Sequence, residues 1–319
     1  MWKKLSAVLF NLLLLGPHPA TAGALDRWRS LVKPACGEAH VAGGIRVTYL
    51  GVNGYLLETG GHALLVDPYF TRVPLGRVAL NLPIASDPQI VAQALAPLPR
   101  RIDAVLVTHG HFDHLLDVPE VIRRTSARLI ASDTAVGLVA AHGLPSLRAT
   151  SVSACDPARS VQRVGPWKVR VLRAAHDRVL GITPYPSQTA APQPLPHRPT
   201  DWIMGEPLAF VIEAAGRRIY IDAGGIPGAA LPPADVAPVD LAIVGVALGE
   251  SRRRLPQLAR ALAPHYLLPS HQDDFFRPLA RGFSFGMTSN FFTVERDSRA
   301  GKIPGQLILL DYYRPWTLR

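Results

Sequence analysis

The sequence has 319 residues, of which 48% are hydrophobic and 18% are charged, and this is enough apolar material for one large core or two small ones. Its formal charge is +10, carried mainly by Arg residues spread along the chain. The absence of a concentrated basic patch weighs against a dedicated nucleic-acid surface. A membrane-spanning helix needs about 18 consecutive apolar residues, and no stretch after the amino terminus is that long. The sequence therefore excludes a transmembrane segment in the mature chain.

The amino terminus has the features of a secretory signal peptide. Lys3 and Lys4 precede an apolar run over residues 5–15, and Ala20-Thr21-Ala22 is a small-x-small cleavage site. We therefore expect a signal peptide over residues 1–22 and a periplasmic or secreted mature protein. A buried first helix is the alternative. Removal of this segment, which carries two lysines and no acid, leaves a charge of +8.

The chain contains two cysteines, Cys36 and Cys155. Neither belongs to a Cys-x-x-Cys spacing, so a thiolate metal site is not expected. In an oxidising compartment the two could form a disulfide, but the sequence does not show whether they come close enough to pair.

The first half of the chain is rich in short strands. The predicted elements are strands at 45–50, 54–58, 62–66 and 103–107, and helices at 87–96 and 117–125. The first three strands resemble an antiparallel meander that ends at Asp67.

The second half repeats this pattern. The predicted elements are strands at 167–172, 208–213, 217–221, 241–246, 266–268 and 306–310, the last being the final strand, and a helix at 252–262. Two β-rich halves, each with helices, favour two sheets packed together with helices outside.

A proline-rich insertion separates the halves at about residues 178–206, with prolines at 184, 186, 192, 194, 196 and 199. A long irregular connection inside a domain is often a binding loop or lid, although a passive surface excursion is equally compatible with the sequence. Several residues here and near the carboxyl terminus either border a site or serve packing: Tyr185, His197, Trp202, Phe275, Phe276, Arg277 and Arg281.

The most informative segment directly follows the buried strand at 103–107. It contains His109, His111, Asp113 and His114 within six residues. Imidazole and carboxylate groups are good Zn²⁺ ligands, and this cluster holds more of them than one metal ion usually takes from one loop. A solvated polar loop is the alternative.

The spacing His-x-His-x-Asp-His resembles the signature of the metallo-β-lactamase superfamily. The resemblance covers most of the mature chain and implies one domain over residues 23–319, with an α/β fold in which two mixed β-sheets form an αββα sandwich. Four further residues at predicted strand ends match the motif positions of that family: Asp67, His176, Asp222 and His271.

The resemblance also implies a set of metal ligands. One divalent ion would bind His109, His111 and His176, and a second would bind Asp113, His114 and His271, with Asp222 shared between them. Zn²⁺ is the expected metal, and Mn²⁺ or Fe fits the same ligands. A hydroxide bridging the two ions would be the nucleophile, with Asp113 as the catalytic residue that steers it or accepts its proton. Asp67 would orient a ligand rather than bind metal.

Residues 47–51, 56–58 and 64–68 resemble the branch that contains ascorbate-6-phosphate lactonase and N-acyl-phosphatidylethanolamine phospholipase D. The chain departs from that branch at Gly51-Val52-Asn53-Gly54, where Gly-His-Ala-Thr is usual, and at Asp222-Ala223-Gly224-Gly225, where Gly-Asp-Thr is usual. The resemblance implies a hydrolase of an ester, lactone or phosphodiester. A nuclease-type phosphodiesterase and a noncatalytic metal-binding protein are the alternatives. The positive charge favours a small, anionic substrate.

Overall fold

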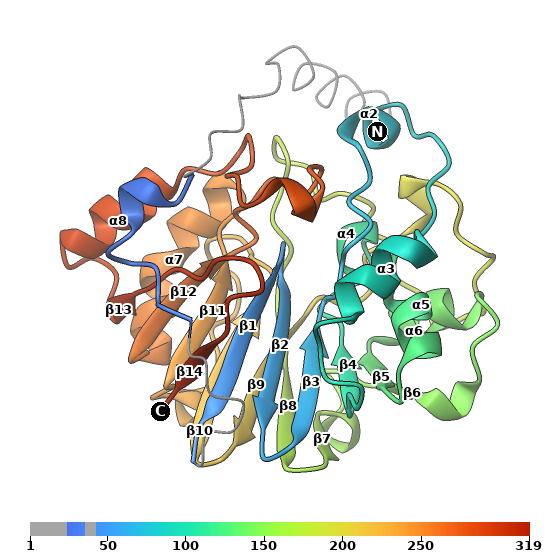
Figure 1. The fold of residues 1–319 in the computed structure, drawn as a ribbon, viewed down its shortest axis with the longest axis horizontal. Helices are drawn as coiled ribbons and strands as arrows, with labels where there is room; N and C mark the ends of the chain where they lie inside the picture. Colours follow the sequence, from blue (N-terminus) through green and yellow to red (C-terminus); the bar gives the residue numbers. More distant parts are fainter. Residues whose placement is uncertain (1–23, 36–42) are drawn as a thin grey trace.

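The computed structural model describes residues 24–35 and 43–319 (Figure 1). The predicted signal peptide and Cys36 lie outside the described residues, so the expected cleavage and disulfide stay predictions. Cys155 is exposed, and its Sγ lies 2.9 Å from a guanidinium nitrogen of Arg173.

The first sheet is built from the amino-terminal half and closed by the last strand of the chain. Its order is β14-β1-β2-β3-β4-β5-β6. The pairs from β14 to β3 are antiparallel and those from β3 to β6 are parallel. The strands are β1 (Ile45–Gly51), β2 (Gly54–Thr59), β3 (His62–Val66), β4 (Ala104–Leu106), β5 (Arg128–Ala131), β6 (Ala149–Ser151) and β14 (Trp316–Leu318).

The second sheet repeats this arrangement in the order β13-β12-β11-β10-β9-β8-β7. The pairs among β7, β8, β9 and β10 are antiparallel, and those from β10 to β13 are parallel. The strands are β7 (Val161–Val164), β8 (Trp167–Arg173), β9 (Leu208–Ala214), β10 (Arg217–Asp222), β11 (Leu241–Gly245), β12 (Tyr266–Ser270) and β13 (Gln306–Leu307).

Side chains that alternate along each strand explain why the two sheets stack. In β3, Leu64 and Val66 enter the core between the sheets, whereas Leu65 faces the outer layer. In β10, Ile219 enters the same core and Tyr220 faces the opposite outer layer. Because successive strand residues point to opposite faces, each sheet buries one face against its partner and the other beneath helices.

Helices cover both outer faces, as Figure 1 shows, with α7 and α8 over the second sheet and α3, α5 and α6 over the first. The helices are α2 (Leu75–Ala79), α3 (Pro88–Leu95), α4 (Phe112–Leu115), α5 (Val118–Arg124), α6 (Asp133–Ala140), α7 (Gly249–Leu262) and α8 (Phe291–Arg299). The predicted αββα sandwich of two mixed sheets is therefore confirmed. Among the described residues, no helix combines the length and the apolar character needed to cross a membrane.

The structure differs from the sequence-based prediction in several details, and β7 and α8 are among the elements that the sequence did not predict. The strand predicted at 306–310 is only the two-residue β13, and the chain then returns to the first sheet to form β14 beside β1. The predicted His-rich loop is partly helical, because α4 begins at Phe112 and carries Asp113 and His114.

Candidate metal centre

The ends of β3, β4, β8, β10 and β12 place the seven predicted ligands and Asp67 at one edge of the sandwich. Each of these residues lies at the carboxyl end of its strand or in the segment that follows it, which for Asp113 and His114 is the short helix α4. Carboxyl ends of neighbouring parallel strands meet at the same sheet edge, which is where α/β folds commonly form their sites. The fold therefore assembles the site from segments up to 204 residues apart, from Asp67 to His271.

His109, His111 and His176 form the first triad. One ligand-capable atom from each residue lies within 4.8 Å of those of the other two. Burial lowers the pKa of His109 and His111 well below the usual range, and it lowers the pKa of His176 to about 4. The three imidazoles are therefore neutral at pH 7, which is the form that binds a metal ion.

Hydrogen bonds on the outer side of each ring determine which nitrogen faces the triad. His111 Nε2 donates to the carbonyl of Pro184 at 3.1 Å, and His176 Nδ1 donates to the carbonyl of Asp177 at 2.6 Å. The Thr108 hydroxyl donates to Asp67, so it accepts from His109 Nδ1 at 3.1 Å. A neutral imidazole carries one proton, so these contacts leave the lone pairs of the remaining nitrogens directed into the triad.

This tautomer assignment gives a direct test of whether a cation fits. His109 Nε2 and His111 Nδ1 lie 3.0 Å apart, and both carry lone pairs rather than protons. Two lone pairs at that distance repel each other unless a positive ion lies between the rings. The donor set of the first triad therefore fits a divalent metal ion, with Nε2 of His109, Nδ1 of His111 and Nε2 of His176 as ligand atoms.

Asp113, His114 and His271 form the second triad, again with ligand-capable atoms within 4.8 Å of one another. Asp113 Oδ2 lies 3.2 Å from His271 Nε2 and 3.5 Å from His114 Nε2. Burial alone would raise the pKa of Asp113, but His114 and His271 hold it well below its usual range. His114 Nε2 is buried and has no hydrogen-bond partner among the described residues. Such an orphaned nitrogen beside a carboxylate fits a second metal ion.

Asp67 orients the second triad from behind. Its Oδ2 accepts from His114 Nδ1 at 2.9 Å, from the Thr108 hydroxyl at 2.6 Å and from the side-chain amide of Asn53 at 2.9 Å. The Asp67 side chain is completely buried and belongs to neither triad. A carboxylate that holds the outer nitrogen of a ligand histidine fixes the ring orientation, which matches the role expected from the sequence.

The contacts of Asp222 are to residues outside both triads. Its Oδ2 accepts from Arg254 Nη1 at 2.9 Å and from the Tyr220 hydroxyl at 2.8 Å. Its Oδ1 accepts from the backbone amides of Gly224 at 3.1 Å and Gly245 at 3.3 Å. Asp222 is fully buried, and neither triad includes it. The structure thus brings together six of the seven predicted ligands, while the carboxylate expected to be shared pairs with an arginine from α7.

A second buried ion pair anchors the loop that carries His271. Arg72 Nη2 lies 2.9 Å from Asp273 Oδ2, and neither side chain is exposed to solvent. The Tyr312 hydroxyl and the backbone amide of Val52 also donate to Asp273. His271 itself has a positive φ of 53°, a conformation that a residue other than glycine rarely adopts. The ion pair therefore anchors the chain two residues from His271, a ligand whose own backbone conformation is unfavourable.

The proline-rich insertion forms one wall of the site. Pro184 supplies the carbonyl that holds His111, and Met204 supplies the carbonyl that accepts from the backbone amide of Gly110. A Cβ atom at Gly110 would overlap the carbonyl oxygen of Ile203, so the residue between the first two histidines must be glycine here. Val179, Pro184 and Tyr185 line the cavity beside the triads.

The other residues singled out from the sequence divide into two groups. Phe275 and Phe276 line the cavity together with Tyr185. Trp202 instead packs in the outer core of the first sheet, stacked on His142, and the cavity lining does not include His197, Arg277 or Arg281.

Sequence reasoning did not single out three charged residues of this region. Arg254 occupies the same helical stripe as the buried Leu258 and Leu262, and a charge at that spacing could have indicated a buried ion pair. No comparable local signal marks Arg72 or Asp273, because their contact joins residues 201 positions apart.

Comparison with known proteins identifies the family. Residues 62–268 match the family model described as "Beta-lactamase superfamily domain". This segment covers more than half of the chain, and the protein therefore belongs to the metallo-β-lactamase superfamily.

Relatives in sequence and in structure agree with this assignment. A protein of Rubrobacter xylanophilus described as a UPF0173 metal-dependent hydrolase is 29% identical over 184 residues, covering 56% of this chain and 60% of that relative. The chain thus spans about 60% of the length of this curated relative. Igni18, a metallo hydrolase of Ignicoccus hospitalis, has a TM-score of 0.58 at 14% identity, covering 86% of this chain and 99% of Igni18. The metallo-beta-lactamase fold protein YhfI of Bacillus subtilis has a TM-score of 0.54 at 13% identity, with coverages of 86% and 99%. At these low sequence identities, the two structures show that the fold is shared and nothing more.

Proposed function

We propose that the protein is a metal-dependent hydrolase that holds two divalent ions, with zinc as the expected metal, and cleaves an ester, lactone or phosphodiester bond. The observation that carries this proposal is the pair of adjacent triads, whose rings meet at a distance of 4.0 Å between the centroids of His109 and His114. When bound, two such ions acidify water and polarise the oxygen of the scissile group. The curated relative described as a metal-dependent hydrolase supports the same reaction class.

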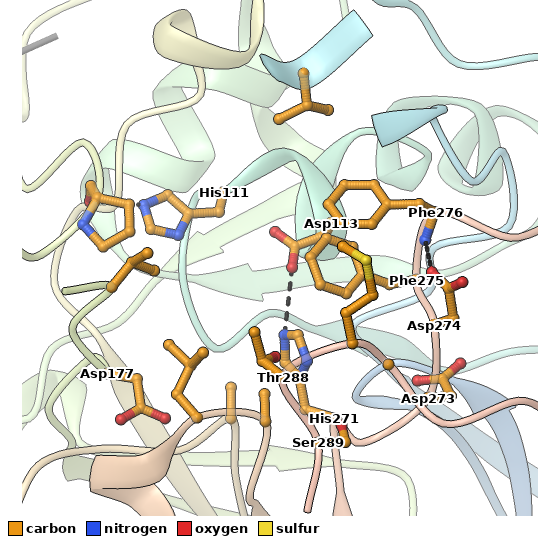
Figure 2. Close-up of a pocket in the computed structure, with 18 of the residues that line it drawn as sticks. His111, Asp113, Asp177, His271, Asp273, Asp274, Phe275, Phe276, Thr288 and Ser289 are labelled. Atoms are coloured by element: carbon orange, nitrogen blue, oxygen red, sulfur yellow. Dashed lines mark hydrogen bonds and ion pairs between the residues drawn. The ribbon is translucent and has the colours of Figure 1, made fainter. Parts of the chain in front are cut away.

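Asp113 is the residue best placed to handle a proton in this reaction. It lines the cavity, where its carboxylate Oδ2 lies 3.2 Å from His271 Nε2. Figure 2 shows it between His111 and the side chain of His271, whose Nε2 it contacts. A carboxylate in that position orients an attacking water and accepts its proton, while the His271 contact restricts its rotation.

The cavity also argues against the two alternative functions, a nuclease-type phosphodiesterase and a noncatalytic metal-binding protein. Its lining contains no Lys or Arg among the described residues, whereas a nuclease uses such residues to bind the phosphate backbone. A noncatalytic metal-binding protein has no need for a cavity that opens onto its ligands. Both observations favour hydrolysis of a small molecule.

The experiment that tests the proposal compares two carboxylate variants of the zinc-loaded protein. A screen of lactones, carboxylic esters, phosphodiesters and β-lactams first identifies the best substrate. Asp113→Asn should then lower kcat about 10²–10⁴-fold, with metal still bound at the first triad. Asp274→Asn is the matched control, because it removes a carboxylate from the same cavity but from outside both triads. Equal kcat in Asp113→Asn and the parent protein would contradict the assigned role, and failure to hydrolyse any substrate class would contradict the proposed reaction.

A further inference from the structure

A cavity of about 180 Å³ opens beside the two triads. Its size indicates what it can hold, since an apolar protein cavity of roughly 150 Å³ accommodates benzene. The space beside the metal ligands is therefore large enough for a phenyl ring or an alkyl chain of about six carbon atoms.

Apolar side chains from three separate segments form most of its wall. The insertion contributes Val179 and Tyr185, the turn before α7 contributes Leu248, and the loop after β12 contributes Phe275, Phe276 and Met287. The Phe275 ring packs edge-on against His271 with centroids 5.5 Å apart, and its centroid lies 4.1 Å from that of the Phe276 ring. Figure 2 shows these two rings next to Asp113, so the apolar wall begins directly at the reacting groups.

The charges of the cavity exclude a negatively charged occupant away from the metal ligands. Its ionisable side chains are His111, His176, His271, Tyr185 and four carboxylates, those of Asp113, Asp177, Asp273 and Asp274, with no Lys or Arg among the described residues that line it. Of these carboxylates, Asp273 is already paired with Arg72 behind the wall. An anionic group there would lose its hydration without gaining a counterion.

The nearby arginines do not alter this conclusion. Arg252 lies at the rim, but one of its guanidinium nitrogens already donates to the carbonyls of Val246, Ala247 and Thr288, each at 3.0 Å. Arg178 pairs with Glu250 through two contacts of 2.6 and 2.9 Å. Both guanidinium groups are thus engaged by acceptors of the protein itself, Arg178 through two nitrogens and Arg252 through Nη1.

We propose that this cavity binds an uncharged, apolar substituent of the substrate, about the size of a phenyl ring or a six-carbon chain, next to the scissile bond. This assignment rests on the proposed function and gives it a substrate class. It replaces the anionic substrate expected from the net charge, since that expectation took no account of where the arginines lie.

A matched set of substrates tests the assignment on the zinc-loaded protein. Methyl acetate, methyl hexanoate and the monomethyl ester of adipic acid share the same reacting group and differ in the length and terminal charge of the acyl chain. We expect kcat/KM to be at least about tenfold higher for the hexanoate than for the acetate, because each buried methylene favours binding. The kcat/KM for the adipate monoester should be at least about tenfold lower than the kcat/KM for methyl hexanoate. Equal kcat/KM for all three esters would overturn the assignment.

Charge introduced into the wall should reverse this preference. Met287→Lys places an ammonium group in the cavity and should raise the ratio of kcat/KM for adipate monoester over hexanoate at least about tenfold. Leu180→Lys is the matched control, because Leu180 follows a cavity residue yet is 75% exposed and outside the lining. It adds the same charge to the protein and should leave the ratio unchanged. Val179→Lys is the second variant if Met287→Lys does not fold, and an unchanged ratio in a folded variant would overturn the assignment.

Binding measurements separate this inference from the proposed function. Hexanamide and adipamic acid resemble the two longer esters but need not be turned over, and their Kd values can be measured by calorimetry. Tighter binding of hexanamide without hydrolysis of any ester would support the cavity assignment and contradict the proposed reaction. Ester hydrolysis with equal Kd values for the two amides would support the reaction and overturn the cavity assignment.

Discussion

Asp222 and Arg254 form a buried ion pair in which the carboxylate Oδ2 lies 2.9 Å from the guanidinium Nη1. Asp222 is fully buried and the Arg254 side chain is 3% exposed. Burial alone would lower the pKa of Arg254, but the neighbouring carboxylate raises it above its ordinary value, so the guanidinium remains charged. The contact attaches α7 to the end of β10 and occupies the carboxylate that the sequence suggested for a metal.

This pair predicts a large effect on stability. Asp222→Asn leaves the Arg254 charge buried without its partner and should lower the free energy of unfolding of the metal-free protein by about 3–5 kcal/mol. Urea unfolding monitored by circular dichroism measures the change. Asp26→Asn is the control, because Asp26 pairs with Arg29 on the exposed surface, where the loss should be below about 1 kcal/mol.

The same variant tests the metal role of Asp222. From the contacts of its two oxygens, we expect Asp222→Asn to retain close to the metal content of the parent after loading with zinc. Elemental analysis of the folded variant gives the stoichiometry. If Asp222→Asn instead loses metal while its stability without metal equals that of the parent, Asp222 would be a shared ligand.

The two triads predict the metal content of the parent protein. The zinc-loaded chain should hold close to two ions, and His111→Ala should hold close to one and lose most activity while remaining folded. Elemental analysis together with circular dichroism checks both statements. His265→Ala removes an exposed histidine outside the triads and should keep two ions. A parent protein without bound metal after loading with zinc or manganese would contradict the dinuclear site.

Asp67 should affect metal affinity without binding metal. Asp67→Ala removes the acceptor of His114 Nδ1 and leaves the ring free to rotate or change tautomer. The affinity for the second ion should fall about 10–100-fold, as is usual when the partner of a ligand histidine is removed. Competition with a chromogenic chelator measures the two dissociation constants separately. Equal affinities in variant and parent would assign Asp67 a purely structural role.

Export is a prediction from the sequence. We propose that the mature chain begins at Gly23 and resides outside the cytoplasm, because residues 1–22 combine a charged start, an apolar run and a small-residue cleavage site. Amino-terminal sequencing and cell fractionation test this directly. Intact Met1-Trp2-Lys3 in cytoplasmic protein would contradict it.

Much of the centre is determined by local sequence. His109, His111, Asp113 and His114 lie within one turn and a short helix, so their proximity follows from covalent connectivity. The strand periodicity of residues such as Leu64, Leu65 and Val66 identifies two buried faces, which indicates a sheet packed on both sides. His176 and His271 could be placed because each follows a predicted strand in the order typical of the family.

Tertiary structure decided the features that depend on contacts between distant segments. Asp222 and His271 look equivalent in sequence, since each lies at or directly after a strand end, yet His271 joins the second triad while Asp222 pairs with Arg254 from α7. The apolar cavity likewise exists only where the insertion, the turn before α7 and the loop after β12 meet. Net charge is a sum over the whole chain, whereas binding depends on the few charges at the site, and only the folded structure shows that Arg252 directs its guanidinium to backbone carbonyls instead.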